Sequence, residues 1–337
     1  MLRFVVRRLL LLVPILVGVS ILVFIWIRLL PGSPAQALLG ERATPQSIAQ
    51  LRLQFGLDKP LYVQYWRYLV ETVGHLNLGT SIKTFRPVTF ELQNRFPATV
   101  ELALAAMVFA IGFGVPLGFF AAKKYGSFFD HASLVASLLG ISIPIFFLGL
   151  ILKYIFAVRL HWLPSIGRED VLAIRSHPTN FYILDAILAG DAGALWDTIK
   201  HLLLPAIALG SIPLAIVARI TRAAVLDVQN EDYVRTARAK GLPPHEVDSR
   251  HVLRNALLPI TTIIGLQTGL LLSGAVLTET VFAWPGVGSL VLDAILRKDY
   301  PVVLAAVEFV AAAFIVINVL LDLLYGYLDP RLQVART

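Results

Sequence analysis

Long apolar stretches alternate with polar segments along this chain. Six of the stretches hold enough consecutive apolar residues to cross a hydrocarbon core of ~30 Å as helices. They are residues 9–30, 98–122, 132–158, 202–218, 257–278 and 302–327. The fourth is the shortest, and it contains Pro205, Gly210 and Pro213, which make its ends the hardest to place. The pattern predicts an all-α membrane protein with six transmembrane helices, the first of them a retained helix rather than a cleaved leader.

The polar segments between these stretches predict the orientation of the chain. With the N-terminus inside, the inner segments are residues 1–8, 123–131, 219–256 and 328–337. They hold 14 Lys and Arg in 65 positions. The two shorter outer segments hold only six in 64 positions. Because Lys and Arg gather on the cytoplasmic side of membrane proteins, both termini are expected in the cytoplasm.

Composition excludes several other classes of protein. Hydrophobic residues make up 57% of the 337 residues and charged residues only 15%, whereas a soluble domain carries about 25% charge. The net charge is +7, and the basic residues lie beside the apolar stretches. We therefore expect contact with lipid and none with nucleic acid. Without cysteine, the chain has no disulfides or thiolate chemistry, and its seven histidines lack a metal-binding spacing.

Residues 31–97 form a long polar segment that still contains helix signals. Thr44-Pro45 is a helix start and Gly56 a stop, and Asp58-Lys59-Pro60 opens a second helix. The second helix carries the aromatic residues Tyr62, Tyr65, Trp66 and Tyr68. Such a cluster beside a membrane favours a packed cap at the level of the lipid headgroups, with direct contact to a substrate as the alternative.

The inner loop 219–256 reads as two short helices. Asn230 can cap the first, Glu231 and Arg235 are spaced as an i,i+4 ion pair, and Gly241 suits the left-handed position that ends a helix. We expect Glu246 and Asp248 to open a second helix that Arg250 and Arg254 close. Ala237 and Ala239 are small residues at which another protein can approach closely. On the residues alone, an ordinary solvated loop explains the segment equally well.

Ionisable residues inside apolar spans are costly and therefore informative. They are Glu101, Lys153, Glu308 and Asp322. For each of them we favour structural pairing over a role in transport. The four-residue spacing of Gly114 and Gly118 permits the close approach of another helix.

The inner loop resembles the cytoplasmic coupling loop of type I ABC importer permeases. The family pattern is Glu-Ala-Ala, three residues, Gly, and further on Leu-Pro. This chain has Arg235-Thr236-Ala237, then Gly241, then Leu258-Pro259. The glutamate is absent, but Asp-Tyr-Val-Arg-Thr-Ala-Arg-Ala-Lys-Gly-Leu, at residues 232–242, is the variant typical of peptide importer permeases.

The rest of the chain resembles the first of the two permease subunits of dipeptide and oligopeptide importers. The matching segments are Arg28-Leu-Leu-Pro-Gly-Ser-Pro34, Phe55-Gly-Leu-Asp-Lys-Pro-Leu61, Arg95-Phe-Pro-Ala-Thr99, Thr278-Glu-Thr-Val-Phe-Ala-Trp-Pro-Gly-Val-Gly288 and Asp299-Tyr-Pro301. Position 33 is Ser where the family often has Asp. The likeness covers nearly the whole chain.

This resemblance implies a function and a set of partners. It implies a non-catalytic, multi-pass permease in the cytoplasmic (inner) membrane of a bacterium, paired with a second, homologous permease. It also implies two cytoplasmic ABC ATPase subunits, which use ATP and Mg, and an extracytoplasmic peptide-binding protein. The chain itself has no Gly-x-x-x-x-Gly-Lys-Ser/Thr loop and is expected to bind no cofactor.

The implied arrangement places the residues of the coupling helix against an ATPase. These residues are Glu231, Asp232, Tyr233, Arg235, Thr236, Ala237, Arg238, Ala239, Lys240 and Gly241. We expect residues 1–93 to form the first span and an extracytoplasmic helical segment. Residues 94–327 are expected to form a five-helix core and residues 328–337 a cytoplasmic tail.

The cargo is left open by the sequence. Di- or oligopeptides, nickel chelates and other small solutes all suit the architecture that the resemblance implies. An ion-coupled secondary transporter that uses Glu308 or Asp322 is the rival from another class, and it gives the 219–256 loop no task. An intramembrane enzyme ranks behind both, because the spans contain no paired aspartates and no Ser/His constellation.

Overall fold

The computed structural model describes the backbone of residues 2–29, 39, 44–54, 56–75, 77–170, 172 and 175–328. The side chains of residues 2–12, 54, 73, 272–274 and 320–328 lie outside the described part. Within the described residues the chain is helical, and one isolated bridge between Thr80 and Pro87 is its only extended pairing. This agrees with the predicted all-α class.

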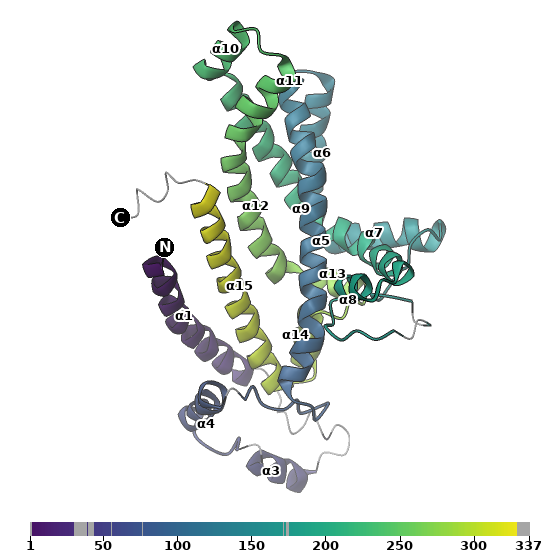
Figure 1. The fold of residues 1–337 in the computed structure, drawn as a ribbon. Coiled ribbons are helices and arrows are strands. Elements are labelled where there is room, and N and C mark those ends of the chain that lie inside the picture. Colours follow the sequence, from purple (N-terminus) through teal and green to yellow (C-terminus); the bar gives the residue numbers. More distant parts are fainter. Residues whose placement is uncertain are drawn as a thin grey trace. The chain divides into compact units, whose positions relative to one another are not determined.

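The helices follow one another along the chain, and a longer connection, residues 160–181, precedes α8 (Figure 1). In order they are α1 (Leu2–Leu29), α3 (Pro45–Gln54), α4 (Leu61–Leu69), η2 (Val70–Gly74), α5 (Val88–Lys123), α6 (Phe128–Ser142), α7 (Ile145–Leu152), η3 (Lys153–Arg159), α8 (Tyr182–Ala189), α9 (Ala192–Gln229), α10 (Asp232–Ala239), α11 (Pro244–Glu246), η4 (Val247–Leu253), α12 (Arg254–Gly274), α13 (Val276–Val281), α14 (Val287–Leu296) and α15 (Tyr300–Leu328). Segments labelled η have π-helical hydrogen bonding.

The described residues of the six predicted apolar stretches are helical, apart from short breaks at residues 143–144 and 275. Among the described residues, three helical segments are long and apolar enough to cross a membrane: Val88–Lys123, Ala192–Gln229 and Tyr300–Val319. A fourth span is formed if the bent pair Phe128–Ser142 and Ile145–Arg159 crosses the membrane as one unit. The chain is therefore a multi-pass helical protein, and the predictions of six spans and of cytoplasmic termini remain predictions.

The third apolar stretch differs from a single continuous helix. It bends by 103° between α6 and α7. Ile143 leaves the helical region, with φ −80° and ψ 122°, and Pro144 follows it. A proline disfavours the helical conformation of the residue before it and donates no backbone hydrogen bond, which explains the break at this point.

The fourth stretch is longer than its sequence pattern predicts. Helix α9 runs without interruption through Pro205 and Pro213. Both prolines are buried, together with Leu204, Ala208 and Leu209. Prolines are tolerated inside a membrane helix when packed neighbours hold it in place. The predicted bounds at 202 and 218 mark only the apolar part of this helix.

Helices α5 and α9 pack closely through glycine. A Cβ atom at Gly210 of α9 would lie 2.6 Å from the carbonyl oxygen of Ala106 on α5. One at Gly114 of α5 would lie 2.9 Å from the carbonyl oxygen of Leu214 on α9. Gly118 likewise faces α9. The close approach that the Gly114–Gly118 spacing permits is therefore made inside this chain.

The chain divides into two compact units. Unit 1 comprises Met1–Thr99 and Pro285–Val316, and unit 2 comprises Val100–Trp284 and Ile317–Thr337. In unit 1, α1, α4, α14 and the first half of α15 share an apolar core around Phe24, Leu92 and Val303. In unit 2, the segment from α9 to α12 shares a second core around Val225, Val247 and Ile260.

Helix starts in the 31–97 segment lie where the sequence predicts them. Helix α3 begins at Pro45, and the Thr44 hydroxyl accepts a hydrogen bond from the Ser47 amide (3.2 Å). Gly56 adopts a positive φ of 64° just after α3, as a stop requires. Helix α4 begins directly after Pro60. Phe55 and residues 31–38, which include the predicted Pro31-Gly-Ser-Pro34 motif, lie outside the described residues.

Asp299 ties the turn before α15 to the loop around residue 82 in unit 1. Its carboxylate accepts hydrogen bonds from the Ser81 hydroxyl (2.5 Å) and from the amides of Ile82 (3.1 Å) and Lys83 (3.4 Å). A buried carboxylate is stable when several donors surround it. The Asp299-Tyr-Pro301 motif thus has a structural task in this unit.

Candidate functional site

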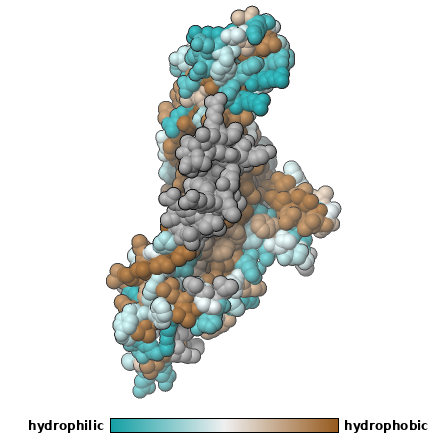
Figure 2. Space-filling model, turned by 60° about the vertical axis from the view of Figure 1, so that its left-hand side comes forward, coloured by the Kyte–Doolittle hydropathy of each residue, from teal (hydrophilic) through white to brown (hydrophobic). Residues whose placement is uncertain are grey.

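The predicted coupling segment forms a short helix at one end of unit 2. Helix α10 lies between the end of α9 and the run of α11, η4 and α12, and Figure 1 shows α10 and α11 together beyond the ends of these long helices. Hydrophilic residues cover this end of the molecule (Figure 2). The segment therefore projects a polar surface from two membrane helices.

Two residues of α10 fix it to the rest of the unit. Val234 and Ala237 are buried, and they pack with Val225 of α9, Val252 of η4 and Ile260 of α12. Ala237 is only 5% exposed. We expected Ala237 and Ala239 to face a partner together, but Ala237 points into this chain's own core, and of the two only Ala239 is exposed.

The other predicted residues of the segment form one exposed face. They are Glu231, Asp232, Tyr233, Arg235, Thr236, Arg238, Ala239, Lys240 and Gly241. Acidic residues lie at the start of the helix and basic residues at its end, which matches the helix dipole. The pKa of Tyr233 is raised by partial burial and by the nearby Glu231. This face therefore presents both acidic and basic side chains to a partner.

The capping contacts of α10 differ from those that the sequence predicts. Asn230 ends α9 instead of capping α10, and its side chain donates to the carbonyl oxygen of Leu226 (3.0 Å). Glu231 occupies the N-cap position without a side-chain capping bond. Arg235 pairs with Asp232 one turn earlier, at 3.6 Å, and not with Glu231. At this exposed helix start, the i,i+3 pair replaces the expected i,i+4 pair.

Gly241 ends the helix as predicted. Its φ is +77°, the left-handed conformation. Its amide donates to the carbonyl of Arg238 (3.0 Å), and the next amide, of Leu242, reaches the carbonyl of Ala237 (3.4 Å). This pair of bonds is the Schellman motif. Leu242 packs against the same core as Val234, so the helix end is fixed on both sides.

The second predicted helix of the loop does not stop at Arg254. From Pro244 the chain continues through η4 into α12 with helical backbone at Leu253 and Arg254. The prediction of a separate helix closed by Arg250 and Arg254 is therefore wrong. The chain needs no turn here because η4 packs directly beneath α10 and buries Val247 and Val252.

Two ion pairs brace the neighbouring helix ends. The Lys123 ammonium at the end of α5 lies 2.7 Å from the Asp248 carboxylate in η4. Arg222 of α9 binds the buried Asp130 of α6 through both carboxylate oxygens. Four helical segments are thereby cross-linked near α10, so its mounting is rigid in several directions.

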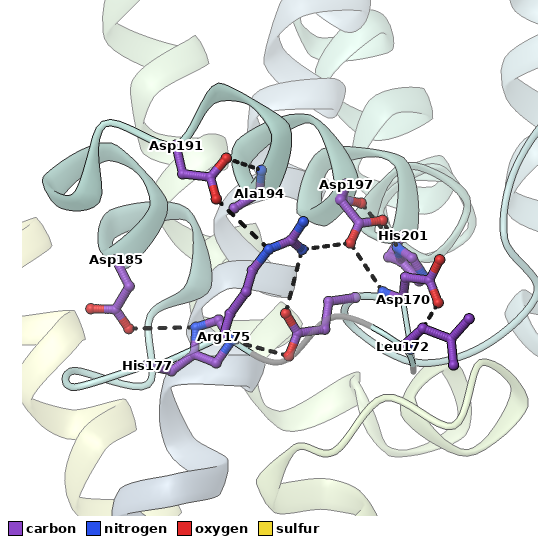
Figure 3. Close-up of polar contacts among 10 residues, drawn as sticks. Asp170, Leu172, Arg175, His177, Asp185, Asp191, Ala194, Asp197 and His201 are labelled. Atoms are coloured by element: carbon purple, nitrogen blue, oxygen red, sulfur yellow. Dashed lines mark hydrogen bonds and ion pairs between the residues drawn. The ribbon is translucent and has the colours of Figure 1, made fainter.

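A second polar cluster, which sequence reasoning missed, joins the 168–181 loop to the start of α9 (Figure 3). The Arg175 guanidinium lies 2.8 Å from Asp197, 3.6 Å from Glu169 and 3.9 Å from Asp191. The hydrogen bond to Asp197 raises the pKa of Arg175. His177 contacts the other oxygen of Glu169 at 3.0 Å. In the sequence, the five acidic residues from position 169 to position 197 are the signal that could have indicated this cluster.

Glu101 and Arg168 form a buried ion pair beside this cluster. Glu101 is 5% exposed and Arg168 is 4% exposed. The second Glu101 oxygen accepts the amide of Ile183 (2.9 Å), and the guanidinium lies 3.7 Å from the ring centre of Tyr182. The pKa of Tyr182 is raised by burial. Both carboxylate oxygens are occupied, as the structural pairing predicted for Glu101 requires.

The remaining ionisable span residues have different surroundings. Lys153 donates to the carbonyl oxygen of Val281 (3.1 Å), which is a structural contact. Burial and the nearby Glu308 raise the pKa of the Tyr68 hydroxyl, but neither this hydroxyl nor Glu308 Oε1 has a hydrogen-bond partner among the described residues. The side chain of Asp322 lies outside the described residues.

An apolar groove of about 720 Å³ runs along unit 2 between α5, α8 and α9. Leu104, Val108 and Phe113 form its α5 wall, and Ile187 and Leu203 stand opposite. Glu101 is its only ionisable lining residue, and that carboxylate is already paired. The groove therefore offers apolar contact without a free charge.

Comparison with known proteins agrees with this architecture. Residues 114–334 match the family model described as the binding-protein-dependent transport system inner membrane component. Residues 1–103 match the model for the N-terminal part of such membrane components. One solved relative in fold is a chain of the MetNI methionine ABC transporter in inward-facing conformations, with a TM-score of 0.54 and 15% identity. The match covers 72% of this chain and 97% of the transporter chain.

Curated relatives match from end to end. The di/tripeptide transport system permease protein DppB of Pseudomonas aeruginosa is 51% identical, over 99% of both chains. The dipeptide permease DppB of Alkalihalophilus pseudofirmus is 47% identical, over 99% of this chain and 100% of its own. The glutathione permease GsiC of Salmonella paratyphi A is 39% identical, over 99% of both. With its long apolar helices and the α10 segment held between two of them, this chain belongs to the binding-protein-dependent inner membrane permeases of ABC transporters.

Proposed function

We propose that this chain is the non-catalytic transmembrane subunit of an importer that carries di- or oligopeptides across the cytoplasmic membrane of a bacterium. Its partners would be a second, homologous permease, two cytoplasmic ATPases that use ATP and Mg, and an external peptide-binding protein. The observation that carries this proposal is the mounting of α10, whose exposed charged face rests on a core shared with α9, η4 and α12. The peptide class is supported by the relatives named for di- and tripeptides.

The α10 mounting suits the transmission of force. A partner that displaces the exposed face from Glu231 to Gly241 must also displace Val234 and Ala237, and with them the ends of two long helices. Protein interiors are close-packed and transmit such strain. Closure of the ATPases on ATP would thereby be converted into movement of α9 and α12, which opens the path to the other side of the membrane.

Two alternatives are less well supported. An ion-coupled secondary transporter needs accessible intramembrane acids, whereas Glu101 is buried and fully paired. It also leaves the rigid mounting of α10 without a task. Import of nickel chelates or another small solute uses the same architecture, and the 39% identity to a glutathione permease illustrates that cargo varies among relatives.

The proposed topology predicts which side of the membrane Ser249 faces. Because the chain contains no cysteine, a Ser249→Cys variant has a single reactive thiol in this subunit. Ser249 is exposed in η4, near α10. An impermeant maleimide is expected to label it in inside-out vesicles and not in intact cells. Labelling of intact cells would reverse the orientation and would remove α10 from the ATPase side.

Affinity purification of the tagged chain in mild detergent tests the function itself. A stoichiometric ATPase and a second permease are expected in the preparation, with ATP hydrolysis stimulated by a peptide-loaded binding protein. Stimulation by a nickel-loaded binding protein alone would change the cargo and keep the architecture. A chain that purifies alone and moves solute along an ion gradient would overturn the proposal.

A further inference from the structure

Helix α4 presents apolar residues on two opposite sides. On one side Tyr65 and Tyr68 pack against the core of unit 1. On the other, Tyr62 is 75% exposed and Trp66 is 66% exposed, and Val70, the first residue of η2, is exposed one turn further on. Residues 62, 66 and 70 recur every four positions and so lie on one face of the helix. Packing within unit 1 explains the inner side only.

Contacts with α1 fix the level of α4 along that helix. The Tyr65 hydroxyl lies 2.7 Å from the Ser20 hydroxyl, and the ring of Tyr65 meets that of Phe24 edge-on at 5.1 Å. One turn further, Arg28 donates two hydrogen bonds to the Gln64 side chain (3.1 and 3.0 Å). At 1.5 Å per residue, the contacts cover about 12 Å of α1.

This stretch of α1 is itself apolar. Ser20, Phe24 and Arg28 lie within Val13–Leu29, an apolar helical segment whose outward residues include Leu22 and Leu29. A helix that packs along the last 12 Å of such a segment lies at the depth of the membrane boundary, not in bulk water. Tyrosine and tryptophan are the residues most enriched at that boundary.

We propose that α4 and the start of η2 form an interfacial anchor whose outer face, formed by Tyr62, Trp66 and Val70, binds the lipid bilayer between headgroups and acyl chains. The occupant is lipid because the α1 segment that sets the depth of α4 is an apolar helix whose exposed side chains, such as Leu22 and Leu29, suit a lipid environment. The exposed Arg67 next to Trp66 can extend toward the phosphates. The anchor holds α1 and the 61–74 segment at a fixed height.

This inference rests on the membrane location of the chain and not on the ATPase coupling, so the two can fail separately. Spin labels test it, again because the chain has no cysteine. The variants Tyr62→Cys and Trp66→Cys change exposed side chains only. They are labelled in the whole transporter complex in lipid nanodiscs, with the unsubstituted complex as background. A label at Ser249→Cys, which is exposed in η4 and lies outside the α10 face assigned to the ATPase, serves as the aqueous reference.

Labels at positions 62 and 66 are expected to collide with oxygen more than with a water-soluble nickel chelate, at a depth of roughly 5–10 Å below the phosphates. The Ser249 label is expected to show the opposite preference. Nickel access at positions 62 and 66 equal to that at position 249 would overturn the proposal. Shielding from both reagents would also overturn it, because that outcome means that a protein covers the face.

Discussion

Replacing Gly241 by Val is expected to lower peptide-stimulated ATP hydrolysis by about tenfold while leaving membrane insertion unchanged. Gly241 has a φ of +77°, and no atom lies within 4 Å of the position that a Cβ would take. The cost is therefore backbone strain alone, roughly 1–2 kcal/mol for an L-residue. Relief of the strain would break the two hydrogen bonds, from the amides of Gly241 and Leu242, that close α10. A cost of about 1.4 kcal/mol corresponds to a tenfold smaller population of α10 docked on the ATPase.

The matched control for this variant is Gly190→Val. Gly190 also has a positive φ, +66°, and open space around it, but it ends the eight-residue helix α8 and not α10. The strain should be similar in the two variants. ATP hydrolysis should fall only in the Gly241 variant. Equal loss in both variants, or none in either, would contradict the role proposed for the end of α10.

The comparison of Gly241 with Ala237 shows which parts of the site were accessible from sequence. A helix stop depends on local backbone conformation, and a glycine after a short charged helix is sufficient to predict it. The direction in which Ala237 points depends on η4 and α12, which pack beneath it from ten or more residues further along the chain. No local pattern contains that information, so the inward face of α10 had to come from the structure.

Burial also explains the polar contacts that were missed. Glu101 was recognised as a costly residue, but its partner Arg168 lies 67 positions away in a loop with no regular pattern. Pro144 accounts for the break after α6, but the 103° size of the bend depends on what α7 packs against, which includes α9 and α13. Sequence thus predicted which positions were unusual, whereas their partners and angles were set by tertiary packing.

Breaking the Glu101–Arg168 pair is expected to have the largest effect on stability. In Arg168→Met, the Glu101 carboxylate stays buried with only the Ile183 amide as a partner. Removal of one partner from a buried pair costs about 3–5 kcal/mol. A double variant, Glu101→Gln with Arg168→Met, removes both charges and keeps an acceptor for Ile183, so most of the loss should be recovered. Unfolding temperatures of the purified complex in one detergent measure the series.

The exposed pair Arg297–Asp293 supplies the control. Its atoms lie 2.6 Å apart, but both side chains are about half exposed, and such pairs contribute about 0–1 kcal/mol. Arg297→Met should therefore leave the unfolding temperature nearly unchanged. If Arg168→Met unfolds at the same temperature as Arg297→Met but abolishes peptide-stimulated ATP hydrolysis, the buried pair acts in transport. Alternatively, Arg168→Met lowers the unfolding temperature, and the double variant restores both the unfolding temperature and ATP hydrolysis. That outcome means that Glu101 and Arg168 hold α5 against the 168–181 loop.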